Sequence, residues 1–132
     1  MLTPQRYSSG RTVTMKTVSE TTITKNNALD FSNGYVQRAT NATTEVRFVA
    51  LEDKTTAAAE HEDILCLLTD GVQFIGDTNS TMAQSKVGTY IDLTDHDTLD
   101  ENTAQDNVFY VTEMVGATTN NKCKGFFVMK ND

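Results

Sequence analysis

The segment NALDFSNGYVQRA, residues 27 to 39, carries the strongest local folding signal in the chain. Asn33 and Gly34 stand at its centre, and both central positions of a type I′ turn need the positive φ that these two residue types adopt readily. Phe31 precedes the pair and Tyr35 and Val36 follow it, and aromatic and β-branched residues favour strands. The segment therefore predicts a β-hairpin with strands over 27–31 and 35–39.

Strands are also predicted through most of the remaining chain. The segment EVRFVALE (45–52) is apolar at many positions, as a strand covered on both faces would be, and ILCLL-TDG-VQFIG predicts a hairpin at Asp70 and Gly71. In NVFYVTEMVG (107–116), strand alternation places Tyr110, Thr112 and Met114 on one face. Further strands are expected over 13–18, 21–25, 86–94 and 122–130. Threonine is abundant and proline occurs once, so we expect an all-β fold, a small antiparallel β-barrel or sandwich.

The length of 132 residues suits one domain with one hydrophobic core. Apolar residues form only 38% of the chain, which predicts a thin core that neighbouring subunits help to stabilise. We expect an extended N-terminal arm over residues 1–20 and a single β domain over residues 21–132.

Charge is unevenly distributed along the chain, which has a net charge of −7. Residues 48–107 hold two Lys or Arg and thirteen acids, whereas residues 1–47 hold six and three. The acidic middle argues against nucleic acid and anionic membrane as partners. Arg6, Arg11 and Lys16 precede the first acid, Glu20, so the arm is basic and needs an acidic or polar partner surface. Tyr7 lies within this arm, where it could anchor in a partner's pocket.

The densest cluster of ionisable side chains is DLTDHDTLDEN, residues 92–102, with His96 among its acids. It does not fit the calcium-loop pattern, because the turn glycine is missing in every register. His61, the other histidine, lies in a separate acidic segment, and nothing in the spacing brings the two together. We expect no specific metal site and interpret this cluster as a turn that faces solvent.

Catalytic patterns are absent from the sequence. There is no G-x-S-x-G motif and no glycine-rich phosphate loop, so we expect neither an enzyme nor a bound cofactor. Cys66 lies in an apolar run and Cys123 in a polar setting, which favours two separate thiols over a disulfide or a metal pair. No apolar run has the length of a secretory signal or a membrane span, so we expect a soluble chain made in a cytoplasm. The aromatic residues of the strands suit core or subunit packing, with sugar stacking as the alternative.

The stretches ALDFSNGYVQRATNATTEVRFVALEDKTT, ILCLLTDGVQFIGDT and VGTYIDLTDHDT together resemble the small head decoration (cement) proteins of tailed bacteriophages. The resemblance covers about residues 28 to 95 and lies in the hairpin that precedes a V-A-L-E-D strand and in a later V-G-x-x-I-D-L strand. It implies a compact β domain, often a homotrimer, that binds the outer surface of the capsid and clamps neighbouring subunits of the major capsid protein. It also implies a virion location, after assembly in the host cytoplasm, and carries no catalytic residues.

The resemblance agrees with the thin core, the β-rich composition and the basic arm. We therefore expect Arg6, Tyr7, Arg11 and Lys16 to contact the capsid, and deletion of residues 1–16 to leave a folded trimer that no longer binds. Two alternatives remain open: another β component of the virion, such as a tail or fibre part, and a sugar- or metal-binding β module.

Overall fold

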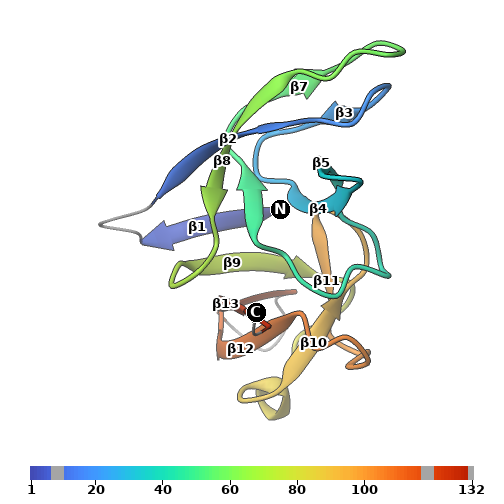
Figure 1. Ribbon diagram of the computed structural model, residues 1–132. Coiled ribbons are helices and arrows are strands. Elements are labelled where there is room, and N and C mark those ends of the chain that lie inside the picture. Colours follow the sequence, from blue (N-terminus) through green and yellow to red (C-terminus); the bar gives the residue numbers. More distant parts are fainter. Residues whose placement is uncertain (7–10, 117–120, 131–132) are drawn as a thin grey trace.

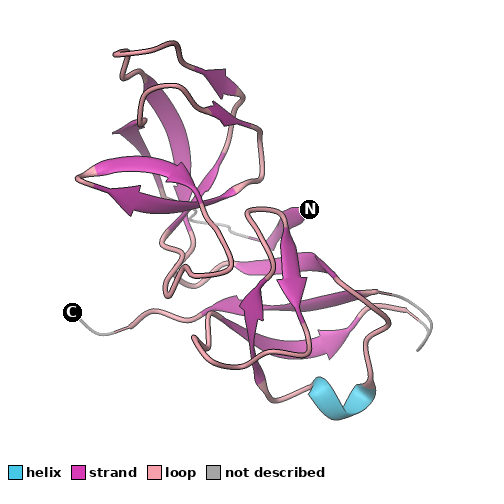
Figure 2. Cartoon of the chain, turned by 90° about the vertical axis from the view of Figure 1, so that its right-hand side faces the viewer, coloured by secondary structure: helices cyan, strands magenta, loops and turns pink. Residues whose placement is uncertain are grey.

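The computed structural model describes residues 1–6, 11–116 and 121–130, and these residues form an all-β structure with two main sheets (Figures 1 and 2). Its only helical element is a short 3₁₀ turn, Gln84–Lys86. The fold class predicted from the sequence is confirmed, with a barrel as the form it takes. Among the described residues, no helix has the length and apolarity that a membrane span requires.

The first sheet closes into a five-stranded barrel. Its strands are β9 (Gln73–Thr78), β10 (Tyr90–Leu93), β11 (Thr98–Asp100), β12 (Phe109–Met114) and β13 (Lys122–Phe127). They follow the order β9-β11-β10-β12-β13, and β13 pairs back onto β9. All of these pairs are antiparallel except that of β9 with β11. Strand β1 (Leu2–Arg6) adds to this sheet along β9.

The second sheet has the order β2-β8-β6-β4-β5. Its strands are β2 (Thr12–Lys16), β4 (Ala28–Ser32), β5 (Tyr35–Arg38), β6 (Phe48–Ala50) and β8 (Asp63–Leu68). A separate two-stranded ladder joins β3 (Thr22–Ile23) to β7 (Lys54–Thr55). Figure 2 shows the second sheet and this ladder on one side of the molecule and the barrel on the other.

The central strand β6 of the second sheet is covered on both faces, as expected for residues 45–52. In β6, Val49 belongs to the larger buried cluster, which extends through the barrel, and its neighbour Ala50 belongs to the smaller cluster inside the second sheet. Leu67 and Cys66 of β8 divide between the clusters in the same way. Because neighbouring residues of a strand point to opposite faces, these central strands contribute side chains to both cores.

The hairpin predicted at Asn33 and Gly34 is confirmed. β4 pairs antiparallel with β5, and the two turn residues have φ values of 52° and 85°. The hairpin predicted at Asp70 and Gly71 is wrong. A turn does form there, with Gly71 at φ 78°, but β8 enters the second sheet and β9 the barrel, so the turn links two sheets.

The extended N-terminal arm is not confirmed. β1 pairs with β9 from Leu2 to Arg6, and the side chain of Leu2 is fully buried. β2 pairs with β8 along its whole length. The described parts of residues 1–20 therefore contribute strands to both sheets, because their backbone groups pair with strands that follow much later in the chain. Deleting residues 1–16 would remove two strands, so it does not separate attachment from folding.

The alternation predicted for residues 107–116 is interrupted by an irregularity. The register of β12 against β13 shifts between Val111 and Glu113. Phe109 and Val111 are buried before the shift, whereas Met114 packs against the core after it and Glu113 is exposed. A bulge of this kind adds one residue to one strand and so changes which face the later side chains occupy.

Candidate partner-binding surface

The structure separates Arg6 from Arg11 and Lys16, three of the four residues predicted to contact a partner. Arg6 ends β1 on the barrel, opposite Gln73 of β9. Arg11 directly precedes β2 and Lys16 ends it, so these two lie on the second sheet, and both are exposed. Tyr7 lies outside the described residues. Arg11 and Lys16 therefore flank and end the same strand, whereas Arg6 belongs to another sheet.

Arg11 lines a small pocket between the second sheet and the segment that follows β13. The pocket has a volume of about 180 Å³ and is lined by Arg11, Arg47, Phe48, Leu68, Asp70 and Met129. The position of Arg11 is fixed by its carbonyl, which accepts a hydrogen bond of 2.9 Å from the N–H of Leu68. The pocket combines the apolar side chains of Phe48, Leu68 and Met129 with two arginines and the acid Asp70.

Lys16 is paired within the chain. Its ammonium lies 2.8 Å from Asp63 Oδ1, across the β2–β8 pair. The hydrogen bond and the charge of Asp63 raise the pKa of Lys16. Both side chains are more than half exposed, and an ion pair this exposed contributes little to stability.

The acidic cluster of residues 92–102 does not simply face solvent, and that prediction is wrong for two of its acids. Asp92 is 2% exposed and Glu101 is 3% exposed. The Asp92 carboxylate accepts hydrogen bonds of 2.8 to 3.0 Å from the backbone N–H groups of Gln105, Asp106 and Asn107. A buried carboxylate needs such donors. Asp92 therefore binds the loop of residues 105–107 instead of facing solvent.

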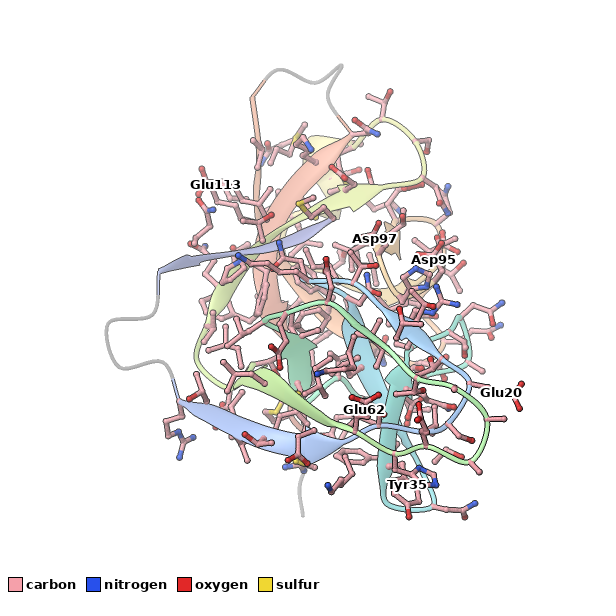
Figure 3. The ribbon with its side chains drawn as sticks, turned by 90° about the horizontal axis from the view of Figure 1, so that it is seen from above. Glu20, Tyr35, Glu62, Asp95, Asp97 and Glu113 are labelled. Carbon is pink, nitrogen blue, oxygen red and sulfur yellow. The ribbon has the colours of Figure 1, made fainter. Side chains whose placement is uncertain are left out.

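The same segment joins the two sheets. The carbonyl of His96 accepts a hydrogen bond of 2.8 Å from the N–H of Ala28, and Asp95 forms a bridge with Thr40. Asp95 Oδ1 also accepts hydrogen bonds from the N–H groups of Asp97 and Thr98, which shapes the turn. Figure 3 shows Asp95 and Asp97 near one another at the side of the molecule. This segment is therefore a structural junction.

The register aligns three aromatic residues on the outside of the barrel. Tyr90 of β10 is opposite Tyr110 of β12, and Tyr110 is opposite Phe126 of β13. The rings of Tyr90 and Tyr110 are 5.0 Å apart, and Tyr90 is 46% exposed. The sequence suggested core or subunit packing for these aromatics, with sugar stacking as the alternative. Only the strand register could have shown that they form a row on one outer face.

Two further aromatic contacts lie on the second sheet. Phe31 is 42% exposed and meets Phe48 edge-to-face at 5.7 Å. Tyr35, labelled at the tip of the β4–β5 hairpin in Figure 3, stacks on His61 at 3.9 Å. His61 Nδ1 is also 2.9 Å from the carbonyl of Thr17. These contacts hold the hairpin and the loop before β8 against the end of β2.

The two cysteines are separate free thiols, as predicted, and both are buried. Burial raises the pKa of each to about 12. Within the part of the chain that the structure describes, no group of three or more His, Cys, Asp or Glu side chains could hold a metal ion.

No protein-family model matches the chain, and no curated protein matches it in sequence.

Proposed function

We propose that this chain is a virion structural protein that binds the outer surface of an assembled phage capsid and stabilises the shell by clamping neighbouring subunits of the major capsid protein. The observation that carries the proposal is the pocket beside β2, where Arg11 lies next to the apolar walls formed by Phe48 and Leu68. Small pockets that take one anchoring side chain are typical of specific protein interfaces. The resemblance of residues 28 to 95 to head decoration proteins identifies the proposed partner.

Stabilisation follows from mass action in this proposal. A protein that binds only the assembled shell lowers the free energy of that shell and so opposes its opening. We propose a homotrimer, because three linked sites bind at a high effective concentration. The acidic surface of residues 48–107 keeps unattached copies apart from one another and from nucleic acid.

The test is co-sedimentation with purified empty heads of the encoding phage, with Arg11→Glu compared against Lys25→Glu. Both residues are exposed cations outside strands, but Lys25 does not line the pocket. We expect Arg11→Glu to lose at least about tenfold in affinity, since it places a like charge where a partner acid binds. Lys25→Glu should bind like the unmodified protein. Equal binding of both variants, or no binding of the unmodified protein, would refute the proposal.

The aromatic row favours a second candidate, a sugar-binding module. Tyr90, Tyr110 and Phe126 present ring surfaces across three adjacent strands, and outer faces of small β-barrels bind oligosaccharides in other proteins. A glycan screen with the unmodified protein and with Tyr90→Ala discriminates the two functions. Glycan binding that Tyr90→Ala abolishes, together with no binding to heads, would favour this candidate.

A further inference from the structure

The outer edge of β2 carries unpaired backbone groups. The N–H of Leu68 donates to the carbonyl of Arg11, and the N–H of Thr17 donates to the carbonyl of Glu62, both at 2.9 Å. These bonds show which residues of β2 form hydrogen bonds with β8. In an antiparallel pair, alternate residues direct their N–H and C=O groups to the partner strand. Thr12 and Thr14 therefore direct theirs to the side away from β8.

Apart from β8, no strand among the described residues pairs with Thr12 to Met15. β5 contacts the end of β2 from that side: Thr17 forms a bridge with Val36, and the N–H of Val18 donates to the carbonyl of Val36. Thr12 and Thr14 are both exposed. Figures 1 and 3 show β2 at the border of the second sheet, with β8 as its neighbour.

The β1 edge and the β2 edge differ in their protection against added strands. β1 contains Pro4, which has no N–H, and its register shifts between Pro4 and Arg6. A proline and an irregularity are two devices that stop an edge strand from pairing further. β2 contains no proline and pairs with β8 in one unbroken register. Its one charged residue, Lys16, lies at its end and forms an exposed ion pair with Asp63 of β8.

Apolar side chains lie on both faces of this edge. Val13 and Met15 are half-buried against the smaller core on one face. On the other face, Leu65 is paired with Thr14 and is 40% exposed. A strand added to β2 would lie directly beside Val13 and Met15 and cover them further, so it would gain burial of apolar surface as well as backbone hydrogen bonds.

The charges at this edge indicate the chemistry of the added strand. Arg11 precedes β2, is exposed, and has no ion-pair partner among the described residues. A second copy of β2, added antiparallel and centred on Thr14, would bring Lys16 of one copy opposite Thr12 of the other, next to Arg11. That arrangement places like charges together and is unfavourable. A segment with acidic residues has the complementary charge.

We propose that the outer edge of β2 is a docking site for an extended, acidic polypeptide segment, which adds to the second sheet as a sixth strand. The hydrogen-bonding groups are the N–H and C=O of Thr12 and Thr14, and Arg11 binds an acidic side chain of the segment. The inference rests on the proposed function only for the source of that segment, a capsid subunit.

The first test uses the ¹⁵N-labelled protein and two acetylated peptides that alternate valine with threonine. One peptide carries an aspartate at each end, and its matched control carries a lysine at each end. We expect the aspartate peptide to shift and protect the amides of Thr12 and Thr14, and to bind about threefold more tightly than the lysine peptide. Absence of changes at these amides, or equal binding of both peptides, would overturn the proposal. So would protection of these amides that rises with protein concentration alone, since a second copy would then be the occupant.

The second test compares Thr14→Pro with Thr14→Ala. Proline removes the outward N–H, which β8 does not use, and prolines are tolerated at edge positions of this kind. Alanine removes the side chain but keeps the N–H. We expect Thr14→Pro to weaken binding to the aspartate peptide and to empty heads by at least about tenfold, and Thr14→Ala to retain both. Binding to heads that Thr14→Pro leaves unchanged would overturn the docking site but keep the proposed function. Peptide binding without binding to heads would overturn the proposed function but keep the docking site. The amide measurement on the unmodified protein decides the question if Thr14→Pro does not fold.

Discussion

Truncation of Leu2 tests whether the first residues of the chain belong to the folded core. Leu2 is fully buried and lies opposite Gly76 in the β1–β9 pair. A Cβ added at Gly76 would lie 3.1 Å from Leu2 Cδ2 and 2.6 Å from Leu99 Cδ1. The two leucines therefore fill the space that this glycine leaves. Leu2→Ala would open a cavity there, and a change of this kind costs about 3 kcal/mol.

Urea denaturation followed by circular dichroism measures this loss, and a thermal melt should show a decrease in Tm of about 10 °C. Gln5→Ala is the matched control, because Gln5 lies on the same strand and is exposed. Its effect should stay within about 0.5 kcal/mol. If Leu2→Ala is no more destabilising than Gln5→Ala, β1 does not pair with β9 in solution and the segment is a free arm after all.

Four further changes test other parts of the structure. Gly125→Ala should prevent the barrel from closing normally, because a Cβ there would lie 2.0 Å from the carbonyl oxygen of Tyr110. We expect a lower melting temperature and loss of the native amide chemical shifts in β12 and β13. A native-like amide spectrum would contradict this prediction. Asp92→Asn should destabilise the fold by at least about 2 kcal/mol, since three N–H groups lose their charged acceptor; urea denaturation measures it, with Asp53→Asn, an exposed acid, as control. Cys66 and Cys123 should not react with a thiol reagent at pH 8 in the native protein, because burial raises each pKa to about 12; both should react in urea, and rapid native labelling would show that one is accessible. For Asp77, burial acts to raise the pKa, but hydrogen bonds from Lys122 and the Met1 amino group lower it overall from 3.8. The ionised Asp77 carboxylate therefore stabilises the fold above pH 3.8, and this stabilisation is lost as the pH falls through the lowered pKa. Asp77→Asn should be less stable than the unmodified protein at neutral pH, and a difference in stability that does not shrink in acid would contradict this assignment.

Local signals predicted the parts of the fold that depend on neighbouring residues. The hairpin at Asn33 and Gly34 forms because its turn geometry depends on two adjacent residues. The same reasoning was insufficient at Asp70 and Gly71, where the turn forms but its flanking strands enter different sheets. A turn residue fixes the backbone of the turn, whereas distant strands decide which sheet each flanking segment joins.

The missed elements have no strand pattern of their own in the sequence. β1 pairs with residues about seventy positions later, and its short segment around Pro4 has no strand pattern of its own. β11 lies inside the acidic cluster, where composition indicated a turn. Likewise, the sequence indicated that Asp92 is charged, but only the fold shows that three backbone donors surround its carboxylate.

The candidate site was predicted in part. The exposed cations Arg11 and Lys16 were identified from charge alone, since charge is a property of the residues themselves. The open edge of β2 and the row formed by Tyr90, Tyr110 and Phe126 depend on register, which assigns each side chain to a face and each N–H to a side. Neither feature can be obtained from the residues of one strand.

The placement of Val49 and Ala50 in two different cores has a consequence for how the molecule unfolds. β6 contributes side chains to both cores, so it cannot separate from one core without disturbing the packing of the other. The barrel and the second sheet should therefore lose their structure in a single cooperative transition. A destabilising mutation in one sheet should therefore also lower the stability of a binding surface on the other. Local opening should be confined to the β3–β7 ladder and to the loops.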